Sequence, residues 1–212
     1  MNLSVLLADD HYLVFRGLEL LVKEVLGENC RISRAESGRQ AEEMLASARY
    51  DLLLLEINMP DTNGLDLVQR ALYLHPDLKI MIVSVSPEHV FAARYLKAGA
   101  LAYVGKDTGD TGLKQAVYQV SQGRKYLSDR MSRELADAVL NGKMLNPFDR
   151  LSQREFEVLL LLLKGQGILE VANSLSIGNS TASTYRSRIF SKLDVGNVIE
   201  LSLLARRYHL VD

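Results

Sequence analysis

Apolar residues in the first 122 positions occur either as short runs or at helical spacing. The run Leu52–Leu55 has four leucines, too few for a helix and typical of a strand buried on both faces. Positions 12–26 instead place apolar residues, among them Leu13 and Leu18, at helical intervals that end before Gly27. Strands are expected over 3–8, 31–35, 52–56, 79–83 and 101–105, and helices over 12–26, 37–48, 65–74, 87–99 and 111–122. This alternation predicts an α/β fold with a five-stranded parallel sheet and helices on both faces.

From Leu151 onward the pattern is helical throughout. Ser152 and Glu155 have the spacing of a capping box, which opens a helix expected over 155–164. Further helices are expected over 169–174, 180–193 and 198–208, with glycine-containing turns between the first three. Two helices joined by a short turn predict a helix-turn-helix, whose second helix can enter a DNA major groove.

The change of pattern divides the chain into three segments. The first domain is expected over 1–122 and the helix-turn-helix domain over 148–212. The more polar stretch over 123–147 is interpreted as a linker that contains a short helix over 132–140. A length of 212 residues suits two small domains of this kind.

Composition limits the compartment and the partners. Cys30 is the only cysteine, which excludes an internal disulfide and fits a reducing cytosol. The longest apolar run, over 158–163, is far too short to span a membrane, and the N-terminus lacks the features of a signal peptide. We therefore expect a cytoplasmic protein without a membrane partner. The net charge of −1 provides no global attraction to nucleic acid.

Polar residues follow the predicted strands at the ends where a parallel sheet gathers its ligand sites. These residues are Asp9 and Asp10 after the first strand, Glu56 after the third, Ser84 after the fourth and Lys106 after the fifth. Three carboxylates in one cleft repel each other and favour a hard divalent cation such as Mg²⁺. A hydroxyl and an ammonium group nearby would hold the oxygens of a phosphoryl group.

With these motifs, residues 1–122 resemble the receiver domain of two-component response regulators, which has a flavodoxin-like fold. The matching residues are Asp9-Asp10-His11, Met59-Pro60, Gly64, Ser84, Tyr103 and Gly105-Lys106. The resemblance implies that Asp9, Asp10, the residue at position 56 and the backbone carbonyl of Asn58 bind Mg²⁺. It also implies that Ser84 and Tyr103 form a switch pair, that Lys106 contacts phosphoryl oxygens, and that a sensor histidine kinase is a partner.

Position 56 departs from the family pattern, because the phosphoacceptor there is an aspartate and this chain has Glu56. The extra methylene moves the carboxylate by roughly 1.5 Å, one carbon–carbon bond. Mg²⁺ coordination and in-line phosphoryl transfer both depend on positioning, so we expect a poor phosphoacceptor. The displaced carboxylate lies closer to the place of a phosphoryl group on aspartate. The hypothesis is a regulator that is independent of phosphorylation or partly mimics the active state.

Residues 148–212 resemble the LuxR-type output domain of the NarL/FixJ family, with most similarity to the GacA/UvrY branch. The matching residues include Leu151-Ser-Gln-Arg-Glu155, Gly165, Glu170-Val-Ala172, Tyr185-Arg186, Ile189 and Lys192-Leu193. The resemblance implies double-stranded DNA as a partner and a homodimer on a two-fold site. The DNA-binding residues that we expect are Ser180, Thr181, Ser183, Thr184, Arg186, Ser187, Arg188 and Lys192.

Two functions remain open at this point. Residues 148–212 contain eight Lys/Arg and seven Asp/Glu, a difference of +1, which is a weak field for a DNA-binding domain. The cations Arg186, Arg188 and Lys192 favour a DNA-binding transcriptional response regulator, because no acidic residue precedes Asp194 on their helix. The many serines there favour the alternative, a protein-interaction regulator that modifies another transcription factor. An enzyme is not expected, since the site can at most exchange a phosphoryl group on itself.

Overall fold

The computed structural model describes residues 3–60, 62–141 and 146–211, so the predicted linker is described only outside 142–145. Two compact units, Met1–Ala136 and Asp137–Asp212, divide the chain. Each unit has its own core, and each is described separately below.

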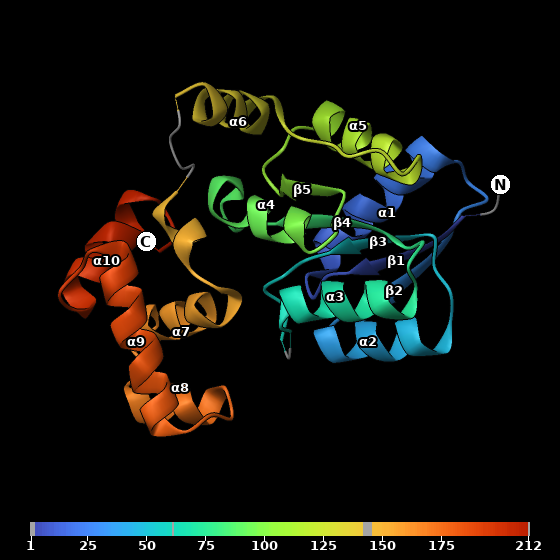
Figure 1. The fold of residues 1–212 in the computed structure, drawn as a ribbon. Helices are drawn as coiled ribbons and strands as arrows, with labels where there is room; N and C mark the ends of the chain where they lie inside the picture. The colour runs from blue at the N-terminus through green and yellow to red at the C-terminus, as the bar shows by residue number, and fades with distance from the viewer. Residues whose placement is uncertain (1–2, 61, 142–145, 212) are drawn as a thin grey trace. The chain divides into compact units, whose positions relative to one another are not determined.

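The first unit contains the parallel sheet that the sequence predicts. Its strands run in the order β2-β1-β3-β4-β5, and every neighbouring pair is parallel (Figure 1). The strands are β1 (Ser4–Ala8), β2 (Arg31–Ala35), β3 (Leu52–Leu55), β4 (Lys79–Ser84) and β5 (Ala102–Gly105). β3 is buried along its whole length because both faces of the sheet are covered.

Five helices cover the two faces of this sheet. They are α1 (Tyr12–Leu26), α2 (Gly38–Ser47), α3 (Gly64–Leu74), α4 (Glu88–Lys97) and α5 (Asp110–Ser121). α1 and α5 pack together on one face, while α2 and α3 lie side by side on the other with α4 next to α3 (Figure 1). An apolar cluster joins alternate residues of the strands to the inner stripes of α1 and α5.

One apolar position of α1 does not face the core. The inner stripe of α1 consists of Leu18, Leu21 and Val22, whereas Leu13 is 83% exposed. Leu13 precedes Leu18 by five residues, which turns it by about 140° around the helix. An apolar residue in a helical pattern is therefore not by itself a core residue.

The chain then enters α6 (Asp129–Asn141), which begins three residues before the helix that the sequence predicts. Ser128 explains the earlier start, because its Oγ accepts a hydrogen bond from the backbone N–H of Met131 at 3.0 Å. Just before α6, Tyr126 forms a parallel bridge with Ala102 of β5.

The second unit is helical, as the sequence predicts. A short 3₁₀ turn, η1 (Pro147–Arg150), was not expected. It is followed by α7 (Gln153–Leu163), α8 (Ile168–Ser174), α9 (Asn179–Leu193) and α10 (Val198–Arg207). α9 packs against both α7 and α8, and the fully buried Phe148 of η1 contacts the ring of Tyr208 edge-on at 5.8 Å.

Candidate functional site

Four predicted side chains meet at the carboxyl edge of the sheet. The ammonium nitrogen of Lys106 lies 2.7 Å from Asp9 Oδ2 and 2.8 Å from Glu56 Oε2. The hydroxyl of Ser84 donates to Glu56 Oε1 at 2.7 Å. Asp9, Glu56 and Ser84 are buried, with exposures of 1%, 3% and 0%. The neighbouring strands β1, β3, β4 and β5 therefore deliver two acids, a hydroxyl and a cation to one place.

Lys106 is a fixed positive charge in this cluster. Burial alone would lower the pKa of its ammonium group, but hydrogen bonds to Asp9 and Glu56, and the charges of both carboxylates, raise the pKa. One half-buried ammonium thus compensates one of two buried carboxylates, and the buried carboxylates require this partner.

Both oxygens of Glu56 are engaged. Oε1 accepts hydrogen bonds from the Ser84 hydroxyl and from the backbone N–H of Asn58 at 3.0 Å, and Oε2 pairs with Lys106. Because both oxygens have partners, the carboxylate is held in a single orientation and in turn orients Ser84 and Lys106.

Asp10 lies beside this cluster and contacts His11. Its side chain is 29% exposed, and its Oδ1 lies 2.9 Å from Nδ1 of His11. Asp9 Oδ1 accepts the backbone N–H of His11 at 2.8 Å. Among the described residues, the acidic and histidine side chains whose ligand atoms all lie within 4.8 Å of one another are Asp9, Asp10 and His11. The sequence predicts Glu56 as a further ligand beside the two aspartates, and in the structure its two oxygens contact Lys106 and Ser84.

Tyr103 points into the protein and is 1% exposed. Its hydroxyl donates to the backbone carbonyl of Ser86 at 3.0 Å, and burial, more than the nearby charges, raises its pKa well above the usual range. The ring of Tyr95 lies 5.8 Å away.

Ser86 is a member of this network that sequence reasoning missed. The side-chain amide of Asn58 donates to Ser86 Oγ at 2.9 Å and to Ser84 Oγ at 3.3 Å. The backbone N–H of Ser86 donates to Ser84 Oγ at 3.2 Å. Asn58 was predicted to act through its carbonyl, but its side chain joins the loops after β3 and β4. A serine two residues after a strand carries no signal for this role.

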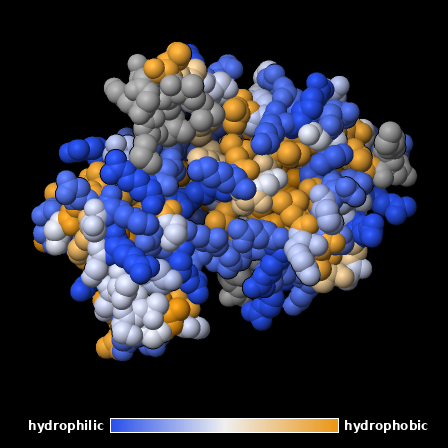
Figure 2. Space-filling view, viewed as in Figure 1, coloured by the Kyte–Doolittle hydropathy of each residue, from blue (hydrophilic) through white to orange (hydrophobic). Residues whose placement is uncertain are grey.

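The predicted DNA-binding residues lie on α9, mostly at the surface. Ser180, Thr181, Thr184, Ser187, Arg188 and Lys192 are exposed, and Ser183 and Arg186 are half-buried. The surface over the lower part of α9 is largely pale in Figure 2, between the extremes of hydropathy. Thr184 Oγ1 donates to the carbonyl of Ser180 at 2.9 Å, and Ser187 Oγ donates to the carbonyl of Ser183 at 3.1 Å. Both hydroxyl protons are thus directed to the helix backbone.

Lys192 has an acidic partner that its own helix does not reveal. Its Nζ lies 2.6 Å from Oε2 of Glu155, a residue of α7 that is 3% exposed. Burial would raise the pKa of Glu155, but the hydrogen bonds from Lys192 and Ser152, with the charge of Lys192, lower it. The acidic partner of Lys192 lies on α7, 37 residues away in sequence, so the charges along α9 alone did not reveal it.

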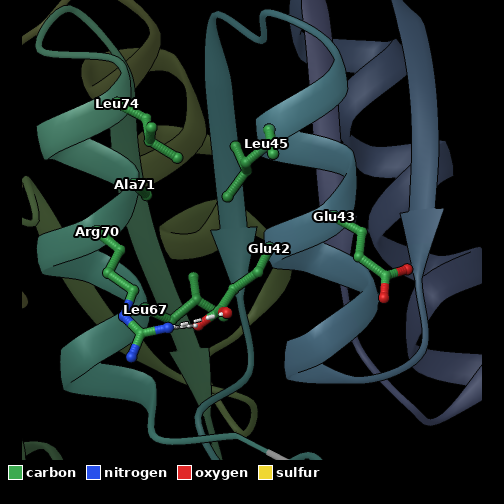
Figure 3. Close-up of a pocket in the computed structure, with 8 residues that line it drawn as sticks. Glu42, Glu43, Leu45, Leu67, Arg70, Ala71 and Leu74 are labelled. Carbon is green, nitrogen blue, oxygen red and sulfur yellow. Dashed lines mark hydrogen bonds and ion pairs between the residues drawn. The ribbon is translucent and has the colours of Figure 1, made fainter.

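A separate cavity of about 350 Å³ lies between α2 and α3 (Figure 3). Leu45 and Leu74 face each other across it, and an ion pair between Glu42 and Arg70 at 3.2 Å closes one end. Its lining contains none of the predicted site residues, so the cavity is distinct from the cluster around Glu56.

Two known protein families match this chain, one over each domain. The family described as response regulator receiver domain matches residues 5–118, and the family described as bacterial regulatory proteins, luxR family, matches residues 149–205. The chain belongs to the response regulator family. This regulator is 34% identical over 211 residues to response regulator GacA of Pseudomonas syringae pv. syringae, covering 99% of the chain and 98% of the relative.

Other relatives agree with this assignment. Response regulator UvrY of Escherichia coli is 30% identical over 209 residues, with 98% of the chain and 95% of the relative covered. A structure of RcsB from Salmonella enterica serovar Typhimurium superposes with a TM-score of 0.76 at 24% identity, covering 96% of this chain and 98% of that one. That likeness confirms the fold.

The protein is a two-component response regulator with a LuxR-type DNA-binding domain, as the sequence resemblance predicted. Its relatives are response regulators of the same two-domain length, and the alternative of a protein-interaction regulator is not favoured. Across residues 3–60, 62–141 and 146–211, every helix is too short or too polar to cross a bilayer.

Proposed function

We propose that this regulator binds double-stranded DNA as a homodimer and that Glu56 keeps its receiver partly active without phosphorylation. The supporting observation is that Ser84 and Lys106 both contact the Glu56 carboxylate, at 2.7 Å and 2.8 Å. A hydroxyl and an ammonium are the groups that would hold a phosphoryl group at this place. The carboxylate therefore occupies the position of their anionic ligand.

The mimicry is partial for an electrostatic reason. A carboxylate carries about one negative charge at neutral pH, whereas a phosphoryl group carries roughly 1.5 to 2. Glu56 therefore biases the equilibrium between inactive and active arrangements without saturating it. Ser84 and Tyr103 act as the switch pair in this proposal, and Lys106 fixes the anion.

The oxygen-rich edge around Asp9 suits Mg²⁺, which prefers carboxylate and carbonyl ligands. Asp9 and Asp10 would hold the ion, with Glu56 and the backbone carbonyl of Asn58 as further oxygen donors. A bound Mg²⁺ would neutralise negative charge at the cleft. Asp10 has the most accessible carboxylate of the three, and its contact with His11 is at the surface, so it can turn without disturbing the core.

The receiver family implies a sensor histidine kinase as a partner, and the glutamate makes transfer from it inefficient. We infer that the receiver comprises residues 1–122, that the linker spans 123–147 and that the DNA-binding domain spans 148–212. We infer further that the protein is a regulator and not an enzyme, and that it acts in the cytoplasm, where a DNA-binding regulator meets its target.

DNA contact is assigned to α9, with Arg186, Arg188 and Lys192 neutralising phosphates. The remaining expected contacts are the hydroxyls of Ser180, Thr181, Ser183, Thr184 and Ser187. The RcsB neighbour was solved bound to promoter rprA in the presence of phosphomimetic BeF3-, which supports DNA as the ligand and an anion-bound receiver as the active form.

The test compares the regulator with Glu56→Gln, which keeps the shape of the side chain and removes its charge. Dimerisation by sedimentation and DNA affinity by titration, at one salt concentration, are both expected to fall. Glu43→Gln is the matched control, because Glu43 is an exposed glutamate of α2 remote from the edge. Unchanged dimerisation and DNA affinity in Glu56→Gln would refute the mimicry.

A further inference from the structure

The segment 126–128, which precedes α6, packs against the receiver. The backbone N–H of Tyr126 donates to the carbonyl of Leu101 at 3.0 Å, next to the bridge with Ala102. Tyr126 is 9% exposed, and Met131 in the first turn of α6 is 2% exposed. The start of α6 is thus fixed to the edge of the sheet.

One hydroxyl joins this start to α4. Ser128 Oγ donates to both oxygens of Glu88, at 2.8 Å and 3.0 Å, and accepts the backbone N–H of Met131 at 3.0 Å. Glu88 is the first residue of α4, and Ser128 directly precedes the first residue of α6. The N-termini of the two helices therefore share a single contact.

Glu88 lies only a few bonds from the cluster around Glu56. Ser84 donates to Glu56 and accepts the backbone N–H of Ser86. Ser86 also accepts the hydroxyl of Tyr103, and Pro87, with φ of −64°, links it directly to Glu88. A ring-constrained residue between Ser86 and α4 limits independent movement of the two.

The surroundings make the carboxylate of Glu88 sensitive to its partner. Burial raises its pKa most, the hydrogen bond from Ser128 acts against this, and the charges of Glu134 and Arg130 add smaller opposing effects. A half-buried carboxylate that loses its donor is costly, so α4 and the start of α6 are expected to adjust together.

We propose that the contact between Glu88 and Ser128 transmits the state of the Glu56 cluster to α6. The proposal rests on the proposed function of Glu56 as an anion that organises Ser84. When Glu56 loses its charge, the hydrogen bond that it accepts from Ser84 weakens, and the loop that carries Ser86 relaxes and displaces Glu88. α6 then loses the contact that secures its first turn. The chain continues from α6 toward the DNA-binding domain, so a change in α6 links the state of the Glu56 cluster to that domain.

A double-mutant cycle on the full chain tests this connection. The four proteins are the parent, Glu56→Gln, Glu88→Ala and the double variant. Glu88→Ala removes the connection and leaves the cap of α6, because Ser128 still accepts from Met131. Hydrogen exchange of the amides over 131–136 is the readout. We expect Glu56→Gln to accelerate exchange there by about tenfold, because hydrogen bonds to a charged acceptor become weaker bonds to a neutral one.

In the Glu88→Ala background, Glu56→Gln is expected to cause no further acceleration. Glu88→Gln keeps an acceptor for Ser128, so in that background Glu56→Gln should again accelerate exchange over 131–136. If Glu88 had only a structural role, Glu56→Gln would have the same effect in the Glu88→Gln and Glu88→Ala backgrounds. Ser132→Ala, at an exposed serine of α6, is the control. An equal effect of Glu56→Gln in both backgrounds, or no effect in the parent, would overturn the proposal.

DNA titration of the same four proteins separates the two proposals. If Glu56→Gln weakens DNA binding equally with and without Glu88, the mimicry by Glu56 stands and the connection fails. If Glu56→Gln leaves DNA binding unchanged but accelerates exchange in α6 only when Glu88 is present, the connection stands and the mimicry fails.

Discussion

Removing the charge of Glu155 should loosen the helix that we assign to DNA contact. Glu155→Gln preserves the capping box, since glutamine also accepts the backbone N–H of Ser152, which Glu155 does at 2.7 Å. It removes the ionic part of the 2.6 Å contact with Lys192. The variant therefore isolates the attraction between α7 and α9 from the local stability of α7.

The size of the effect follows from the burial of the two partners. A hydrogen bond between charged groups contributes about 1.5–3 kcal/mol. Glu155 is buried, but the side chain of Lys192 is 40% exposed, so water screens part of the attraction. We expect Glu155→Gln to lower the free energy of unfolding by about 1–2 kcal/mol. Lys192→Met should cost more, about 2–3 kcal/mol, because it leaves a buried carboxylate without its cation.

Hydrogen exchange on the full chain measures this difference. Amides near the fully buried Ile189, in the middle of α9, should exchange roughly 5- to 30-fold faster in Glu155→Gln at pH 7. Lys164→Gln removes an exposed lysine from the end of α7 and serves as the control. Exchange in Glu155→Gln and Lys192→Met that equals the control would refute the role of the pair.

The pH dependence provides a second check. The folded-state pKa of Glu155 is lowered, so its contribution is fully present above the ordinary glutamate pKa of about 4.3 and is lost as the pH falls through the lowered value. The parent and Glu155→Gln should converge in stability as the medium becomes acidic. A difference that persists when Glu155 is protonated would show that the charge is not its source.

Two further predictions concern phosphate chemistry and DNA. The parent should not acquire label from acetyl phosphate in the presence of Mg²⁺, whereas Glu56→Asp should, because aspartate places the carboxylate for in-line attack; equal labelling of both on residue 56 would contradict this. Arg188→Ala should weaken binding similarly across DNA sequences and flatten the salt dependence, while Thr184→Ala should change the preference between sites; no effect of either on titrations would show that α9 is misassigned.

The fold was predictable because each element depends on local signals. The four leucines of β3 and the glycine after α1 mark a strand and a helix end without any tertiary information. The convergence of Asp9, Glu56, Ser84 and Lys106 followed from the parallel topology, which brings strand ends to one edge.

What the sequence could not supply were contacts that depend on side-chain direction. The bond of Asn58 to Ser86 and the ion pair of Lys192 with Glu155 join residues 28 and 37 positions apart. Neither partner belongs to a recognisable motif with the other. The start of α6 was also missed, because Ser128 acts as a cap only once the chain before it is fixed to β5 through Tyr126.

The bonds from Thr184 and Ser187 to their own helix limit what these two residues can recognise. With the hydroxyl proton given to a carbonyl of the preceding turn, each oxygen retains only lone pairs for an outside partner. In the major groove, lone pairs can meet the amino groups of adenine and cytosine but not the carbonyl oxygens of guanine and thymine. While these bonds persist, the two side chains distinguish base edges that donate from those that only accept. Because these two side chains separate bases into only two classes, finer discrimination between DNA sequences depends on the bending and groove width of the DNA.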